Sequence, residues 1–83
     1  MYEEEEEVYN VGDLVCRTVL YTDYYLKEKK IKKETFNRMV GTVVERNSKV
    51  LTVKLLTDRL VYGSNGTFMI LDTKLAEKIY FDE

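Results

Sequence analysis

A chain of 83 residues, 45% of them hydrophobic, has the size of one small domain with a single core. It contains no histidine and one cysteine, so it lacks the commonest general base, a thiolate metal cluster and an internal disulfide. Its four glycines do not have the spacing of a phosphate-binding loop, and no apolar stretch approaches the ~20 residues that cross a bilayer. We therefore expect a non-catalytic protein without a cofactor, a metal or a membrane span.

The net charge of −2 conceals a strong asymmetry along the chain. Residues 1–13 carry six acids and no base, a charge of −6, while residues 14–60 carry eleven bases and five acids, a charge of +6. Residues 61–83 carry two bases and four acids, a charge of −2. This distribution predicts a binding role, either toward an anionic partner or toward the chain's own acidic segment.

The chain begins with an acidic segment, which we expect to form a flexible arm over residues 1–9, ahead of a folded domain over residues 10–83. Clustered carboxylates repel each other and bury no apolar surface. The arm has three interpretations: it solubilises the protein, it competes with nucleic acid for the basic segment, or it binds a basic partner protein. In the last case the partner-binding residues are Glu3, Glu4, Glu5, Glu6 and Glu7. A secretory signal would begin with bases and an apolar stretch, so a cytoplasmic location is expected.

The first predicted strand covers residues 14–21, after a turn at residues 11–13. The segment is rich in β-branched and aromatic side chains, and its alternation turns Leu14, Cys16 and Leu20 toward the core. Cys16 is therefore expected to be a small buried hydrophobe and not a reactive thiol. Residues 22–38 show no apolar stripe and are expected to form a long loop or hairpin arm, with a short helix as the alternative.

Two hairpins are predicted in the second half of the chain. Residues 39–46 and 50–56 form the strands of the first, joined by a tight turn at residues 47–48. A turn at residues 57–59 leads to the second, whose strands, 60–62 and 67–71, flank an Asn-Gly turn.

The end of the chain contains an apolar run at residues 68–71, which cannot all face one side of a strand. We expect burial on both faces or at an interface. The tail predicts one helical turn over residues 72–77 and a final strand over residues 78–81. Together, five or six short strands predict a mainly β fold, a small closed or nearly closed barrel.

Two short motifs resemble the opening of SH3-like barrels, including the KOW-type barrels of transcription and translation proteins. Gly12-Asp13-Leu14-Val15 is similar to the Gly-Asp-x-Val of their first strand, and Gly41-Thr42-Val43-Val44 to the Gly-x-Val of their second. The resemblance covers roughly residues 10–81 and implies one SH3-like barrel of five or six short antiparallel strands. About 25 residues separate the motifs, more than is usual in the family, which implies an enlarged first loop. Barrels of this family bind RNA, DNA, ribosomal surfaces or peptides, so the resemblance implies a binding role.

The enlarged loop combines lysines with tyrosines. Lysines bind phosphates and aromatic faces stack on unpaired bases, so this combination predicts nucleic-acid binding. The predominance of lysine over arginine favours contact with the backbone over reading of bases. The predicted nucleic-acid-binding residues are Tyr24, Tyr25, Lys27, Lys29, Lys30, Lys32, Lys33, Arg38, Arg46 and Lys49, and Lys54 and Arg59 extend this surface. The alternative interpretation is that the lysines solubilise an exposed loop while the tyrosines pack onto the barrel.

We predict a small non-catalytic module that binds nucleic acid, RNA in preference to DNA. The composition, rich in Lys, Glu and Tyr and without Trp, His or Pro, resembles that of small proteins from AT-rich bacteriophage genomes. The alternative function is accordingly a protein-binding module, such as a phage-encoded modulator of a host factor, acting through the acidic arm or an exposed barrel edge. A third interpretation is a structural component of a larger assembly that pairs strands through an exposed barrel edge, and the same edge could join copies of the chain in a homo-oligomer.

Overall fold

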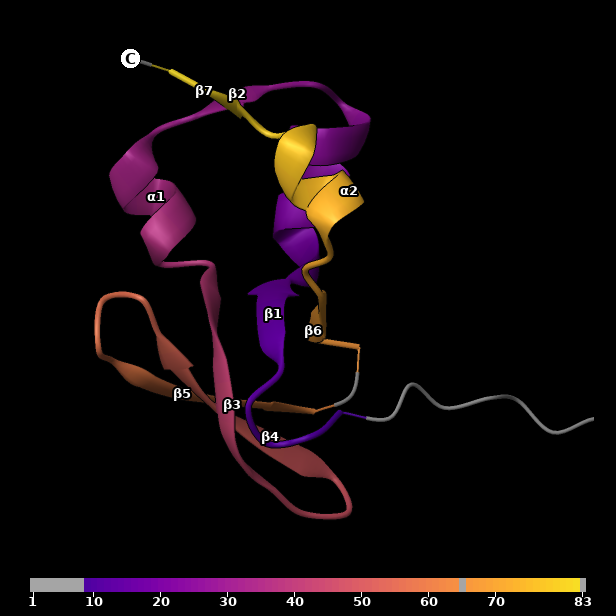
Figure 1. Ribbon diagram of the computed structural model, residues 1–83, viewed down its shortest axis with the longest axis vertical. Coiled ribbons are helices and arrows are strands. Elements are labelled where there is room, and N and C mark those ends of the chain that lie inside the picture. The colour runs from indigo at the N-terminus through magenta and orange to yellow at the C-terminus, as the bar shows by residue number, and fades with distance from the viewer. Residues whose placement is uncertain (1–8, 65, 83) are drawn as a thin grey trace, which may run out of the picture.

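The computed structural model describes residues 9–64 and 66–82 (Figure 1). The predicted acidic arm lies outside the described residues except for Tyr9, which is buried and donates its hydroxyl hydrogen to the carbonyl oxygen of Phe68 at 2.6 Å. The elements are β1 (Leu14–Arg17), the π-helix η1 (Leu20–Leu26), β2 (Lys30–Ile31), α1 (Lys33–Asn37), β3 (Val40–Arg46), β4 (Val50–Leu55), β5 (Leu60–Ser64), β6 (Phe68–Ile70), α2 (Thr73–Glu77) and β7 (Tyr80–Phe81).

The fold is mainly β, as predicted, and is built on a five-stranded antiparallel sheet in the order β5-β4-β3-β1-β6. The predicted central hairpin is confirmed as β3 and β4. The side-chain Oδ1 of Asn47 accepts hydrogen bonds from the backbone N–H groups of Lys49 and Val50, at 2.9 and 2.8 Å, which fixes the turn between these strands. The predicted turn at residues 57–59 also forms, and there Leu55 N donates to Arg59 O at 2.8 Å.

The prediction of a second hairpin was wrong. Among the described residues β5 pairs only with β4, whereas β6 pairs with β1, so the two strands lie at opposite edges of the sheet. The two edges approach where Thr67 N donates to Ser64 O at 3.1 Å, but the described strands do not close into a continuous ladder. The physical reason is burial, because β6 has apolar side chains on both faces and β5 exposes Leu60 and Tyr62. Pairing with β1, which also buries both faces, removes more apolar surface from water.

The predicted strand over residues 14–21 is also wrong beyond Arg17, because the chain turns into η1. Leu20 is buried there, and Tyr21, Tyr24 and Tyr25 pack around the same core, at the spacing of one helical face. Helical packing therefore outweighs the β propensity of these residues. The expected loop at 22–38 contains η1, β2 and α1, and α1 corresponds to the short helix that was the alternative. Leu14, expected in the core, is 43% exposed.

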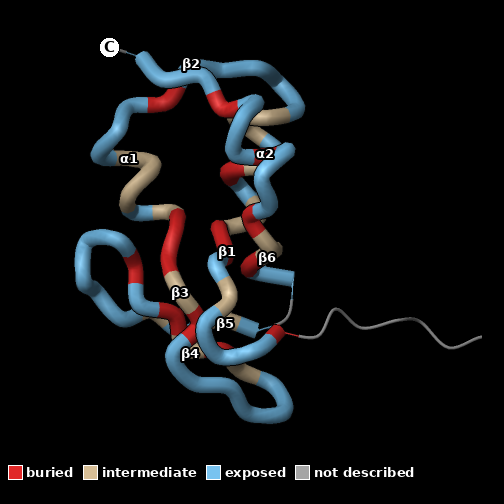
Figure 2. The backbone as a smooth tube through the Cα atoms, in the orientation of Figure 1, coloured by how far each residue is buried: buried red, intermediate tan, exposed pale blue. Residues whose placement is uncertain are grey.

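The core consists of two clusters on opposite sides of β1 and β6, and not of the single core expected (Figure 2). Neighbouring residues in a strand point to opposite faces, so Val15 belongs to one cluster and Cys16 to the other. In the same way the apolar run at 68–71 is buried on both faces, as predicted. The sheet cluster comprises Tyr9, Val15, Val43, Leu51, Val53, Leu55 and Phe68. The helix cluster comprises Cys16, Leu20, Ile31, Val40, Leu71, Leu75 and Ile79.

The tail has the predicted helical turn and final strand. The Oδ1 atom of Asp72 accepts a hydrogen bond from Leu75 N at 2.8 Å and caps the N-terminus of α2. β7 then pairs in parallel with β2, with Ile31 opposite Phe81, in a separate two-stranded sheet. This pairing joins the end of the described chain to the segment between β1 and β3, which appears at the top of Figure 1.

Candidate functional site: a lysine segment and an arginine pocket

The lysine segment, residues 27–33, is exposed but held in place. Its five lysines are all exposed, whereas Ile31 is 1% exposed and lies in the helix cluster. Asp82 N donates to Ile31 O at 2.9 Å beside the β2–β7 pair. Lys27 pairs with Asp23 at 3.2 Å, and the ammonium group of Lys33 lies 5.3 Å from the ring centroid of Phe81. The segment thus presents its cations from an anchored backbone.

The predicted tyrosines sit beside the lysine segment but are partly covered. Tyr24 and Tyr25 are both half-buried and pack against the helix cluster. Tyr25 also stacks on Tyr21, with ring centroids 5.0 Å apart and an interplanar angle of 22°. Packing of the tyrosines onto the domain is the role that the sequence offered as the alternative to base stacking.

The structure does not bring all the predicted basic residues together. Arg46 and Lys49 lie on the β3–β4 hairpin, at the end of the molecule opposite to β2 and α1 (Figure 1). The guanidinium of Arg46 donates to the carbonyl oxygen of Tyr9 at 2.8 Å, which gives this arginine a structural contact. Arg38, in contrast, directly follows α1 and thus lies on the same side of the molecule as the lysine segment.

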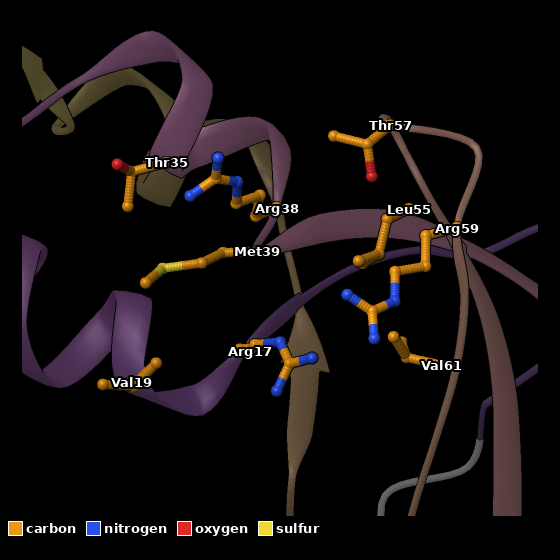
Figure 3. A pocket seen from close by; sticks show the side chains of 9 residues that line it. All are labelled: Arg17, Val19, Thr35, Arg38, Met39, Leu55, Thr57, Arg59 and Val61. Atoms are coloured by element: carbon orange, nitrogen blue, oxygen red, sulfur yellow. The ribbon is translucent and has the colours of Figure 1, made fainter.

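Sequence reasoning missed a pocket that Arg38 lines together with two further arginines (Figure 3). We call it the arginine pocket, and its volume is about 590 Å³. Its lining combines three arginines, two threonines and four apolar side chains: Arg17, Val19, Thr35, Arg38, Met39, Leu55, Thr57, Arg59 and Val61. The pocket therefore has both hydrogen-bond donors and an apolar surface.

Strand alternation explains how the pocket is built. Arg17 lies two residues after Val15, so its side chain leaves β1 on the face of the sheet cluster. Leu55 belongs to that cluster and Val61 packs against it, so the cluster continues into the floor of the pocket. Arg59 comes from the turn between β4 and β5. The alternation expected for residues 14–21 did not foresee the consecutive burial of Val15 and Cys16.

The electrostatics of the pocket favour an anion. None of the lining residues is acidic, and the two ion pairs found among the described residues, Lys27–Asp23 and Lys54–Asp58, involve none of its arginines. Figure 3 shows the guanidinium groups of Arg17 and Arg59 turned toward the same space beside Val61, and Arg38 beside Thr35 on another wall. Like charges that face one space repel each other, and an anion between them would remove the repulsion.

The described part of the chain contains neither a cluster of metal-ligating side chains nor a membrane-spanning helix. Between residues 9 and 82, position 65 excepted, no group of three or more His, Cys, Asp or Glu side chains is placed to hold a metal ion. No described helix has the length and apolar character needed to cross a membrane. Comparison with protein-family models, with curated proteins and with solved structures found no match to this chain. The site must therefore be interpreted from its own chemistry.

Cys16 lies outside the lysine segment and the arginine pocket. From the ionisation of its buried thiol we predict how the free energy of unfolding depends on pH. It is 0% exposed, and burial, with a smaller effect of the Asp72 carboxylate, raises the pKa of its thiol from 9.0 to about 12. Above about pH 9 the unfolded chain loses this proton while the folded protein keeps it. The free energy of unfolding should therefore fall between about pH 9 and pH 12, and the Cys16 thiol should contribute up to about 1.4 kcal/mol per pH unit to this fall. Below pH 9 the thiol should make no contribution to the pH dependence.

Urea unfolding of the wild type and of Cys16→Ala, at several pH values from about 8 to 11, would measure this contribution. Tyrosines and lysines titrate in both proteins, so the difference between the two curves isolates the thiol. The wild type should lose stability more steeply than the variant above about pH 9. Parallel curves would contradict the assignment.

Proposed function

We propose that this protein is a non-catalytic SH3-like binding module that binds the sugar-phosphate backbone of nucleic acid, RNA in preference to DNA. The observation that carries the proposal is the lysine segment, five exposed cations on a backbone anchored by Ile31 and by the β2–β7 pair. Residues 27–38 contain six bases and two acids, a local charge of +4. An anchored cationic surface binds phosphates with a smaller loss of conformational entropy than a free loop.

The pairing of the two motifs supports the SH3-like part of the proposal. Leu14 of the first motif lies opposite Thr42 of the second. Gly12 N donates to Val43 O at 2.8 Å, and Val43 N donates to Asp13 O at 3.0 Å. The last strand of the large sheet, β6, also lies next to the first, β1. Closure into a barrel would in addition require β5 and β6, the two edges of the described sheet, to pair with each other.

A titration with labelled single-stranded RNA and DNA of one sequence would test the proposal. The wild type should bind RNA more tightly than DNA. Contact with three or four phosphates should weaken binding about 20- to 50-fold between about 50 and 200 mM salt. Replacement of Lys29, Lys30, Lys32 and Lys33 by Glu should abolish binding.

The matched control replaces Lys49, Lys54 and Lys74 by Glu at exposed positions outside the lysine segment, and it is compared with the triple variant in which Lys29, Lys30 and Lys32 are replaced by Glu, which changes the net charge equally. It should weaken binding far less than the segment variant does. Absence of wild-type binding at low salt would refute the proposal. Equal losses in the two variants would show that net charge, and not the lysine segment, determines binding.

A second candidate function, protein binding by strand addition, is favoured by the β5 edge. In the described sheet β5 is paired on one side only, and it exposes 49% of Leu60 and 69% of Tyr62. The partner is then a host protein or a second copy of this chain. Affinity capture from a nuclease-treated lysate and sedimentation of the purified protein would distinguish these partners. Recovery of one stoichiometric protein that Leu60→Lys abolishes would favour this function over nucleic-acid binding.

A further inference from the structure

The arginine pocket has a chemistry of its own that the lysine segment does not explain. The five lysines are spread along an exposed segment, whereas the pocket is lined by arginines from β1, from the residue after α1 and from the β4–β5 turn, and the guanidinium groups of Arg17 and Arg59 are turned toward the same space (Figure 3). We infer that this pocket binds an organic phosphomonoester, with the phosphate on the arginines and an apolar body on the floor. Where the ligand is the terminal nucleotide of a nucleic-acid strand, this inference rests on the proposed binding of nucleic acid.

The polar part of the lining fits a phosphate. Arginine presents donors in a planar fork that matches the oxygens of a phosphate, and the hydroxyl group of Thr57, turned toward the interior of the pocket in Figure 3, adds a further donor. A phosphomonoester carries a charge of about −1.5 to −2 at neutral pH, whereas a carboxylate or an internal phosphodiester carries about −1. Two guanidinium groups that face one space, a third in the lining and no acidic lining residue therefore favour the monoester.

The apolar part of the lining shows that the ligand is larger than phosphate alone. A volume of about 590 Å³ lies within the range of about 300–1,000 Å³ found for small-molecule sites. The floor is formed by Leu55 and Val61, which continue the sheet cluster, and Met39 and Val19 complete the apolar wall. Methionine adapts its shape to flat rings, so this wall suits a nucleobase or a similar ring.

Two sources could supply this ligand, namely the 5′-phosphorylated end of a nucleic-acid strand and a free mononucleotide. The experiment measures the affinity of the full-length protein for four probes at about 50 mM salt. The first pair is one single-stranded RNA oligonucleotide with a 5′-phosphate or a 5′-hydroxyl, and the second pair is adenosine monophosphate and adenosine. Each pair differs only by the phosphomonoester.

Four variants locate the phosphate. Arg17→Gln and Arg59→Gln each remove one guanidinium group. Arg59→Lys keeps the positive charge but removes the planar set of donors. Lys49→Gln, in the turn between β3 and β4 and outside the pocket lining, removes one positive charge as a control. Arg59 is exposed in a turn, so its variants keep the test valid if Arg17→Gln does not fold, and circular dichroism would verify the fold of each variant.

We expect the wild type to prefer the phosphorylated member of a pair by about tenfold or more, and each Gln variant to lose most of that preference. Arg59→Lys should retain part of it, and Lys49→Gln all of it. Preference within the oligonucleotide pair identifies the strand end as the source, and preference within the adenosine pair alone identifies a free mononucleotide. Absence of preference in both pairs, or a preference that survives both Gln variants, would overturn the inference. If the two oligonucleotides bind equally, the proposed binding to the nucleic-acid backbone still stands. If neither oligonucleotide binds, the proposed binding to the backbone is refuted, whatever the result with the adenosine pair.

Discussion

Gly41→Ala is expected to destabilise the protein by about 3 kcal/mol or more, a large fraction of the 5–15 kcal/mol typical of small domains. Gly41 is buried in β3, between Val15 of β1 and Leu55 of β4. A Cβ atom at this position would lie 2.8 Å from the Cα of Leu55 and 2.8 Å from a methyl carbon of Val53, and nearer still to the carbonyl oxygen of Lys54. Two of these three neighbours are backbone atoms of the paired strand, so the clash can be relieved only by separating β3 from β4.

The matched control is Gly12→Ala, the same substitution at a position where a Cβ would meet no atom within 4 Å. Gly12 has φ +100°, so alanine there should cost about 1–2 kcal/mol through backbone strain alone. Urea unfolding followed by circular dichroism would compare the two variants. A loss at Gly41 no greater than that at Gly12 would show that β3 and β4 are not packed as closely as described.

Phe68→Ala is expected to cost about 3–5 kcal/mol, because it removes the largest fully buried side chain of the fold. The ring of Phe68 reaches from β6 across to β5, where its Cε2 atom lies 2.6 Å from the position that a Cβ of Gly63 would occupy. It thus links two edge strands that share no ladder of hydrogen bonds. Its removal leaves a cavity and also releases the contact that brings these edges together.

Two further variants make the Phe68 prediction specific. Phe68→Leu keeps most of the apolar volume and should cost clearly less than Phe68→Ala. Tyr62→Ala removes an aromatic ring from β5 that is 69% exposed, and it should change the free energy of unfolding by no more than about 0.5 kcal/mol. Thermal and urea unfolding would measure all three. Similar losses for Phe68→Ala and Tyr62→Ala would contradict the burial of Phe68.

The elements predicted correctly are those whose signals are local. The β3–β4 hairpin follows from two apolar alternations around an Asn turn, and the helical turn predicted at residues 72–77 is α2, which the side chain of Asp72 caps. The elements predicted wrongly depend on distant partners. Residues 18–21 have β propensity but continue into η1, because Leu20 and Tyr21 pack in the helix cluster with Leu71, Leu75 and Ile79. The strand partner of β6 was likewise decided by burial on two faces.

The candidate sites divide in the same way. The lysine segment could be predicted from the sequence because five lysines within seven residues remain together in any fold that exposes them. The arginine pocket could not, since Arg17, Arg38 and Arg59 are each about twenty residues apart and look like scattered surface bases. The tertiary structure brings them to one pocket, because the end of β1, the end of α1 and the β4–β5 turn lie around it.

The sequence by itself therefore determined a small mainly β domain, its central hairpin, its charge asymmetry and its exposed lysines. These properties depend on composition and on interactions between residues close together in the sequence, which do not require the tertiary structure. The tertiary structure alone decided that the core has two clusters, that β5 and β6 lie at opposite edges, and that three arginines line one pocket. These properties depend on which distant apolar surfaces cover each other, and that is determined by the free energy of burial over the whole domain.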